Sequence, residues 1–327
     1  MEQSYIPEKV RKDYLTGHLN KERAADLLIS LIESSDDTEI RIESINVLRD
    51  IKIQNQTIYK ILENLILSDE SVRVRNSVLH EILDNYLEQA KDPIVWIIEH
   101  ENSPIILKSI FDFFETVDQF GYGYILKKIA RWFRKFSSNL GITIEESRFF
   151  LDLEVIFATD KPNYEINYSS YKFFQKLSDI KGDDPWLLIK KKHVEVLNLN
   201  YFNWKYIKDN EDVMNSFLNL YDLNTYLETL KKYDLDLNCF ELPTSIGKLI
   251  NLKKLILKKN NLKDLPCSIV NLQNLNVLDL SQNLFNEIPS FVSSLKSLEK
   301  LNLKNNNIQI IPEDMKLFLN SLKEFRI

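Results

Sequence analysis

Residues 252–260 read Leu-Lys-Lys-Leu-Ile-Leu-Lys-Lys-Asn, and the spacing of their leucines and asparagine returns twice farther along the chain. The first leucine recurs as Leu275 and Leu298, and the closing asparagine recurs as Asn283 and Asn306, always at a step of 23 residues. A proline follows each asparagine after six positions. An internal repeat of this length indicates a protein built from stacked copies of one structural unit.

Each copy is expected to form one coil of a solenoid. Its leucines, such as Leu252, Leu255 and Leu257, fit a short parallel strand that points its apolar side chains inward. One coil cannot bury this apolar face alone, so neighbouring coils must stack. We expect the asparagines to donate side-chain hydrogen bonds to backbone carbonyls of adjacent coils, because buried carbonyls need a partner.

The repeats resemble the short leucine-rich-repeat class of plant intracellular Ras-group-related and Ras-suppressor-like proteins. Three similar motifs carry the resemblance, which extends over about residues 194–327. They are Leu242-Pro-Thr-Ser-Ile246-Gly-Lys-Leu249, Leu265-Pro-Cys-Ser-Ile269 and Ile288-Pro-Ser-Phe-Val292. The resemblance implies a curved solenoid that binds other proteins on its concave face, with no catalytic residue and no cofactor.

The earlier copies depart from this pattern. Val194–Leu199 is expected to form a further strand, and a copy that begins near Leu230 is irregular and one residue short. Between them, a segment at about 205–228 has apolar residues at helical spacing, which predicts an inserted helix. A long insertion within a repeat usually maps to one face of a solenoid and is often part of its binding face.

Residues 1–140 are predicted to be helical, because apolar residues recur three and four positions apart. A weaker repeat relates the segments that begin at Asp36, Asp69 and Ser103. These segments resemble HEAT-type repeats, whose inner helix opens with an apolar residue and an arginine. Arg41 and Arg73 match that pair, whereas the third copy has no arginine there. The resemblance implies an α-solenoid that binds proteins.

Three regions follow from these patterns. HEAT-like helical repeats are expected at 1–140, and a leucine-rich-repeat domain with short parallel strands is expected at 191–327. Residues 141–190 would join the two as a helical linker and cap the N-terminal end of the second solenoid. Within this linker, Ile144–Ile156 has the spacing of a helix. The predicted fold class is thus an α-helical solenoid followed by an α/β solenoid.

The composition disfavours several classes of protein. Apolar residues make up 44% of the chain, yet no stretch approaches the roughly 18 apolar residues of a membrane span. The two cysteines, Cys239 and Cys267, and the lack of a secretory pattern at the N-terminus predict a cytoplasmic protein. Neither glycine-rich phosphate motif occurs and the four histidines are scattered, so no cofactor or metal is expected.

Charge is unevenly distributed along the chain. Residues 1–120 carry 13 Lys and Arg against 23 Asp and Glu, whereas residues 230–327 carry 14 against 10. The segment 125–136 is expected to form an amphipathic helix with five cations on one side: Lys127, Lys128, Arg131, Arg134 and Lys135. Such a helix can bind an anionic membrane or nucleic acid. The favoured interpretation is an ordinary solenoid helix with solvated cations, because five charges alone give little specific affinity.

The candidate binding residues are the outward positions of the repeat strands and one adjacent lysine, because side chains alternate across a strand. They are Lys254, Ile256, Lys258, Lys259, Val277, Asp279, Lys300, Asn302 and Lys304. The lysines form a basic stripe that favours an acidic protein partner by steering and complementarity.

No set of residues assembles a nucleophile, a base and an orienting group, so we predict a non-enzymatic interaction scaffold. The first resemblance leaves a regulator or effector of a small GTPase as an alternative. The HEAT resemblance leaves a bilin-lyase-like or nucleic-acid-binding protein, which is less favoured. The segment Leu322–Ile327 begins one more strand, and an open strand edge can pair with a partner strand or with a second copy of the chain. The favoured interpretation is that the preceding helix-like stretch, Met315–Leu319, covers this end.

Overall fold

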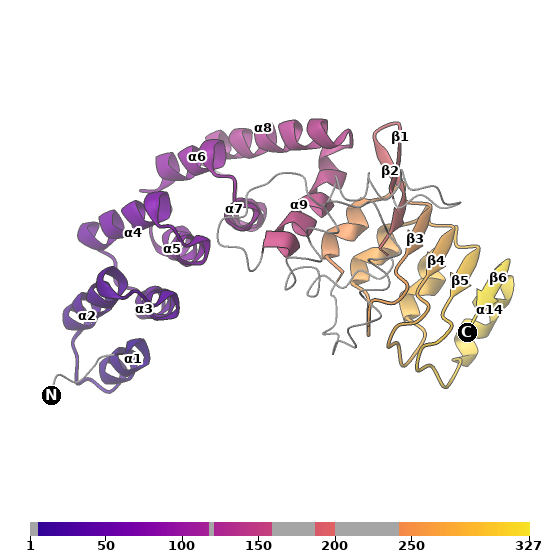
Figure 1. The fold of residues 1–327 in the computed structure, drawn as a ribbon, viewed down its shortest axis with the longest axis horizontal. Coiled ribbons are helices and arrows are strands. Elements are labelled where there is room, and N and C mark those ends of the chain that lie inside the picture. The colour runs from indigo at the N-terminus through magenta and orange to yellow at the C-terminus, as the bar shows by residue number, and fades with distance from the viewer. Residues whose placement is uncertain (1–5, 118–120, 159–186, 200–241) are drawn as a thin grey trace, which may run out of the picture. The chain divides into compact units, whose positions relative to one another are not determined.

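The computed structural model describes residues 6–117, 121–158, 187–199 and 242–327 (Figure 1). The chain divides into two compact units. The first comprises Met1–Trp132 with Ala158–Ile166, and the second comprises Phe133–Phe157 with Asn167–Ile327. A helical first half is followed by a region of short strands, as the sequence predicts.

The first unit consists of helices whose starts are fixed by local sequence signals. In α2 to α5, the side chain of Asn20, Asp37, Asn55 or Ser71 accepts a hydrogen bond from a backbone N–H of the first turn. The helices are α1 (Pro7–Leu15), α2 (Lys21–Ser34), α3 (Thr38–Ile51), α4 (Gln56–Ser68), α5 (Val72–Asn85), α6 (Lys91–His100), α7 (Pro104–Thr116) and α8 (Gly123–Leu140), which continues into the second unit.

Successive helices pack as pairs, α2 with α3, α4 with α5 and α6 with α7, and the second members α3, α5 and α7 pack on one another. Apolar residues at helical spacing fill these contacts, and Leu28, Ile45, Val78 and Ile110 have no exposed surface. The weak sequence repeat therefore corresponds to repeated helix pairs.

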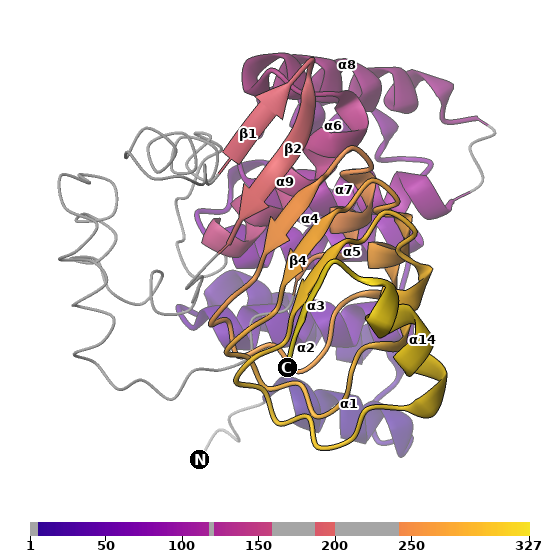
Figure 2. The ribbon, with the colours of Figure 1, turned by 90° about the vertical axis from the view of Figure 1, so that its right-hand side faces the viewer.

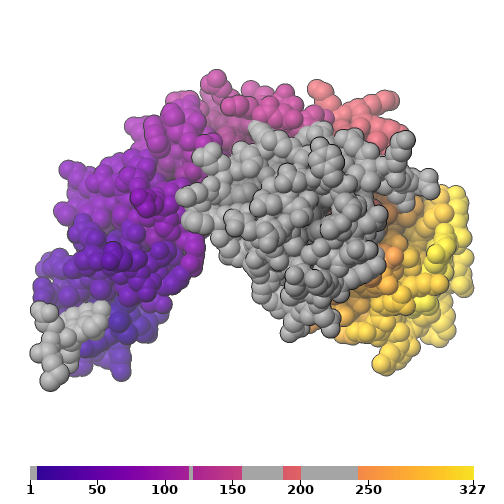
Figure 3. All heavy atoms as spheres, in the orientation of Figure 1, coloured from indigo at the N-terminus to yellow at the C-terminus, as the bar shows by residue number. Residues whose placement is uncertain are grey.

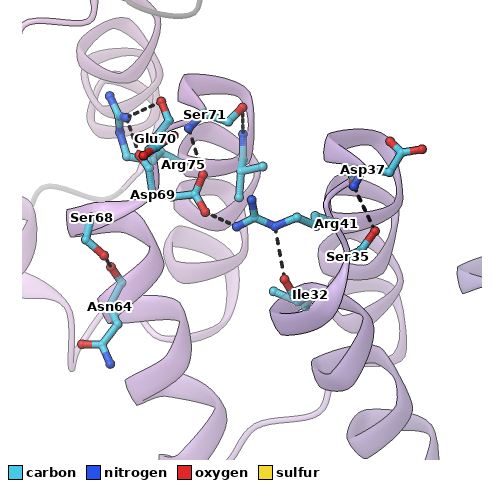
Figure 4. A network of polar contacts seen from close by, with 11 residues as sticks. Ile32, Ser35, Asp37, Arg41, Asn64, Ser68, Asp69, Glu70, Ser71 and Arg75 are labelled. Atoms are coloured by element: carbon cyan, nitrogen blue, oxygen red, sulfur yellow. Dashed lines mark hydrogen bonds and ion pairs between the residues drawn. The ribbon is translucent and has the colours of Figure 1, made fainter.

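The arginine that repeats the contacts of Arg41 in the next helix pair is Arg75, not Arg73 as the sequence repeat suggests (Figure 4). Arg41 donates to the Ile32 carbonyl at 3.2 Å and pairs with Asp69 of the next helix pair. The equivalent contacts are made by Arg75, which donates to the Asp69 carbonyl at 2.7 Å and pairs with Glu101 at 3.2 Å. The alignment of Arg41 with Arg73 is therefore wrong by two positions.

The reason is that a sequence spacing does not show which side of a helix faces the next pair. Arg73 points to solvent and pairs with Glu39, and both side chains of that pair are more than half exposed. Arg75 and Glu101 are each 16% exposed. Their charges interact in a less polar environment, so loss of one partner leaves the other partly buried without an opposite charge.

Arg73 and Arg75, which both lie in α5, allow the exposed and the partly buried ion pair to be compared in matched variants. We expect Arg75→Ala to lower the free energy of unfolding by about 2–4 kcal/mol, because Glu101 would be left partly buried without its partner. Arg73→Ala should lower it by less than about 1 kcal/mol, since its ion pair is exposed. Urea unfolding of both variants checks the prediction, and equal losses would contradict the assignment of Arg75 to the inter-pair contact.

One carboxyl group is buried inside the first unit. Glu81 in α5 has no exposed surface, and only its Oε2 has a hydrogen-bond partner in the described part of the chain, the Asn85 Nδ2 at 2.9 Å. Burial raises the pKa of Glu81 to about 7, and the charge of nearby Asp84 adds to this, against the opposing effects of Asn85 and Arg49.

The raised pKa of Glu81 predicts how stability changes with pH. Because the folded chain binds this proton more tightly than the unfolded chain, the contribution of Glu81 to stability is full below about pH 4 and lost as pH rises through about 7. The wild-type chain should lose stability between pH 5 and pH 8 because Glu81 ionises. Glu81→Gln removes this ionisation, so its free energy of unfolding should fall less over the same range, by on the order of 1 kcal/mol. Denaturant midpoints at the two pH values test this, and parallel pH profiles would contradict it.

The second unit contains one six-stranded sheet in the order β1-β2-β3-β4-β5-β6. The strands are β1 (Leu187–Lys190), β2 (His193–Asn198), β3 (Lys254–Ile256), β4 (Val277–Asp279), β5 (Lys300–Asn302) and β6 (Glu324–Arg326). The pairs from β2 to β6 are parallel, and β1 is antiparallel to β2. The strands predicted from the leucine pattern are confirmed.

Each strand from β3 to β5 is the first part of a coil that closes through a helical segment on the opposite side (Figure 2). These segments are η2 (Cys267–Asn271), η3 (Ser290–Ser294) and α14 (Glu313–Ser321), and η1 (Thr244–Lys248) precedes β3. The core leucines of β3, β4 and β5, namely Leu255, Leu278 and Leu301, are at most 1% exposed. They form one continuous apolar row through the stack.

The asparagine prediction is confirmed at all three positions. Asn283 Nδ2 donates to the Leu257 carbonyl of the preceding coil at 2.8 Å and to the Leu280 carbonyl of its own coil at 2.9 Å. Its Oδ1 accepts from the backbone N–H groups of Asn260 and Leu262. Asn306 repeats the donor pattern toward Leu280 and Leu303. The side chains thereby connect backbone groups of adjacent coils.

Two features at the start of this sheet were not predicted. β1 and β2 form a hairpin whose two-residue turn, Lys191-Lys192, has positive φ angles of 50° and 68°. In addition, β2 pairs directly with β3, and Asn260 donates to the Leu199 carbonyl at 2.8 Å. The irregular repeat copy expected near Leu230 therefore contributes no strand between β2 and β3 in this sheet. Residues 230–241 and the helix expected at about 205–228 lie outside the described residues.

The helix α9 (Ile144–Ala158), predicted at Ile144–Ile156, is bound to the start of this sheet. Its buried Glu146 accepts a hydrogen bond from the Val194 backbone N–H at 3.1 Å and lies 3.1 Å from His193 Nδ1. Burial raises the pKa of Glu146, against the opposing hydrogen bonds from His193 and Val194. Ser245 of η1 donates to Asp152 of the same helix. These contacts fix α9 to both the hairpin and the first coil.

Candidate protein-binding face

The outward side chains of β3, β4 and β5 form a single surface, which we call the strand face. The parallel register places Lys254, Val277 and Lys300 side by side in one row, and Ile256, Asp279 and Asn302 in the next. Lys258, Ser281 and Lys304 follow at equivalent positions just beyond the strands. Since neighbouring strands lie about 4.8 Å apart, lysines two strands apart are separated by about 10 Å at their backbones.

The predicted binding residues differ in how much surface they offer. Lys300 and Lys304 are exposed, whereas Lys254, Lys258, Val277, Asp279 and Asn302 are half-buried. Ile256 is only 8% exposed, so it presents little surface to a partner. Asp279 is held within the face, because its Oδ1 accepts from the Ser281 N–H at 2.9 Å and its Oδ2 accepts from Asn302 Nδ2 at 3.1 Å.

Lys259 lies outside the rows of the strand face. Its φ angle is 58°, and its backbone N–H donates to the Ser281 carbonyl at 3.1 Å. Gln282 and Asn305, which occupy the same place in the next coils, both have φ angles of 57°. The left-handed conformation at this position therefore recurs in the coils of β3, β4 and β5, and it sets the backbone at Lys259 independently of any binding role.

The charge of the strand face is partly neutralised by a residue that the repeat pattern did not single out. Glu324 of β6 is paired in register with Lys300, and its Oε2 lies 3.2 Å from the Lys300 ammonium. The Lys300 hydrogen bond and the Arg326 charge hold the pKa of Glu324 below its usual range. Extending the repeat register to Leu322–Ile327 would have placed Glu324 beside Lys300 from sequence alone.

Two lysines keep an uncompensated charge. Lys258 and Lys304 lie at equivalent positions two coils apart, and neither has a carboxylate within ion-pair distance among the residues that the structure describes. An anionic group between them would gain favourable interactions with both without first breaking an ion pair.

The coils of this region pack side by side, as the space-filling view shows for the face that it draws (Figure 3).

The cationic helix expected at 125–136 lies within α8. Its apolar residues Ile125, Ile129, Phe133 and Phe136 are buried, as predicted. On the other side, Lys127, Arg131, Arg134 and Lys135 are exposed. Lys128 is instead 19% exposed, pairs with Glu99 of α6 and lies 5.2 Å from the Tyr124 ring. One of the five cations therefore pairs with a carboxylate of a neighbouring helix.

The described residues contain no group of three or more His, Cys, Asp or Glu side chains arranged to hold a metal ion. None of the helices in this part of the chain has the length and apolar character that crossing a membrane requires. Of the histidines, His193 is engaged with Glu146, and His100 stacks on Trp96 with ring centroids 4.5 Å apart. The strand face is thus the candidate site that the repeats themselves create.

Comparison with known proteins supports the repeat assignment. Residues 250–308 match the leucine rich repeat family. Among solved structures, a leucine-rich-repeat protein of Leptospira interrogans is 25% identical, with a TM-score of 0.26. The match covers 47% of this chain and 32% of that protein, so the chain spans about a third of its length. None of the curated proteins matches the chain.

Proposed function

We propose that this leucine-rich-repeat chain is a non-enzymatic interaction scaffold that binds an acidic segment of another protein across the strand face. The observation that carries the proposal is the placement of Lys258 and Lys304 on one face with no carboxylate beside them among the described residues. Leucine-rich repeats commonly mediate binding between proteins, and residues 250–308 match that family.

The spacing of the lysines suits an extended acidic segment. Lys258 and Lys304 belong to coils that are separated by one further coil, so their backbones lie about 10 Å apart. Side chains of an extended peptide recur about every 7 Å on one face, so such a segment can place separate carboxylates near the two lysines. Asn302 is half-buried beside the lysines and adds a polar group to the same surface, whereas Ser281 is only 4% exposed and presents little surface.

Three finer assignments belong to this proposal. The Leu265-Pro266 and Ile288-Pro289 motifs support the plant Ras-group-related and Ras-suppressor-like class. The stacked helix pairs support HEAT-like repeats in the first unit, and the two cysteines support a cytoplasmic location. A role as a regulator or effector of a small GTPase rests on the resemblance, and no contact of the strand face favours it over other acidic partners.

Binding of a labelled ten-residue polyglutamate peptide, followed by fluorescence anisotropy, tests the proposed face. We expect the double variant Lys258→Glu/Lys304→Glu to weaken binding by about 10-fold or more, because both uncompensated charges are reversed. The control is Lys263→Glu/Lys296→Glu, which makes the same change in net charge at two exposed lysines outside the strand face. This control should retain binding within about 2-fold.

Equal losses in the two double variants would mean that the peptide responds only to net charge, which would contradict a site on the strand face. Absence of binding to the unmodified chain at low salt would contradict the proposal as a whole. If the result is as expected, the same pair of variants distinguishes specific partners in a native lysate: a protein captured by the control but not by Lys258→Glu/Lys304→Glu binds through the strand face.

A further inference from the structure

The edge strand β6 combines free backbone groups, a part-exposed aromatic ring and two opposite charges on three consecutive residues. We propose that β6 pairs with β6 of a second copy of this chain, antiparallel and centred on Phe325, to form a two-fold symmetric dimer with one continuous sheet. This interface does not include Lys258 or Lys304, the two lysines on which the proposed function rests.

The hydrogen bonds within the sheet show which backbone groups β6 leaves available. The Glu324 N–H donates to the Glu299 carbonyl and the Arg326 carbonyl accepts from the Leu303 N–H, so both residues bond toward β5. In a parallel ladder, alternate residues bond to opposite neighbours. The N–H and carbonyl of Phe325 therefore point to the other edge, where no strand pairs with β6 among the described residues.

Two-fold antiparallel pairing is the arrangement that satisfies both groups of Phe325 at once. In an antiparallel pair, residues that lie directly opposite exchange two N–H···O=C bonds when their backbone groups face each other. If the pairing is centred on Phe325, the Phe325 N–H of each copy donates to the Phe325 carbonyl of the other. The interface is then isologous and closes at two copies rather than forming an open polymer.

The same register makes the charges of β6 complementary. Residues on either side of the centre exchange places, so Glu324 lies opposite Arg326 of the second copy, and this contact occurs twice. Opposite charges directly across an antiparallel pair stabilise it, whereas like charges destabilise it. Within one chain, Glu324 is already ionised and lies beside both Lys300 and Arg326. A two-fold pairing therefore builds a network of alternating charges across the joined sheets.

Apolar surface at this coil gives the pairing a further source of stability. Phe325 occupies the core position whose counterparts Leu255, Leu278 and Leu301 are at most 1% exposed, yet Phe325 itself is only half-buried. Leu317 of α14, which closes the coil of β5, is 85% exposed, and Ile327 beside β6 is 47% exposed. Figure 2 shows α14 nearest the viewer at this end of the stack. Pairing at β6 would bring the two Phe325 rings together as a cross-strand aromatic pair.

Sedimentation velocity of the full chain between about 5 and 500 µM tests the proposal, because an interface built on a three-residue strand is expected to be weak. We expect a monomer that converts to a dimer within this range. Arg326→Glu should weaken self-association by about 10-fold or more, since two like-charged pairs then face each other. The swapped variant Glu324→Arg/Arg326→Glu should recover it, because exchange of the two residues leaves the pairing self-complementary.

Lys296→Glu, an exposed charge reversal in the preceding coil, is the control and should associate as the unmodified chain does. Circular dichroism confirms that each variant is folded, and the swapped variant keeps the test valid if Arg326→Glu alone is unstable. A monomer at every concentration, a dimer that Arg326→Glu leaves unchanged, a failure of the swap to restore the dimer, or assemblies larger than two would each overturn the proposal.

Discussion

The hydrogen bonds of Asn260, Asn283 and Asn306 are the interaction on which the second unit depends. Each amide side chain bonds to backbone carbonyls of its own coil and the preceding one, and Asn260 and Asn283 do so at buried positions, where these carbonyls need a partner within the protein. These bonds fix the register between coils. Because the register is fixed, outward residues such as Lys258 and Lys304 recur at the same height and form rows. The candidate binding surface is thus a consequence of buried polar chemistry.

The two ends of this sheet differ in what covers their edge strands. At the β1 end, an antiparallel hairpin covers the first parallel strand, and α9 is attached to it through Glu146 and through the Thr143 N–H bond to the Lys192 carbonyl. The β6 edge has no such hairpin among the described residues, and its exposed backbone groups are flanked by a glutamate and an arginine. Charges at a strand edge discourage unspecific pairing, and the same charges select a complementary strand.

In the first unit arginines connect successive repeats, as asparagines do in the second unit. Arg41 and Arg75 each reach a backbone carbonyl at the end of an outer helix and a carboxylate of the following helix pair. Both units therefore connect successive repeats through side chains that satisfy backbone groups and cross to the next repeat. Arginine suits the helical unit because its long side chain spans the distance between helix pairs and donates several hydrogen bonds at once.

The sequence by itself determined the parallel strands, the bonding role of the asparagines, the apolar side of α8 and the helix at Ile144, because each depends on neighbours close in the chain or on an exact repeat. Only the tertiary structure decided that β2 lies beside β3, that Arg75 rather than Arg73 makes the part-buried contact between helix pairs, and that Ile256 is buried. These features depend on contacts between residues distant in sequence, and the periodicity of one segment contains no information about which other segment will pack against it.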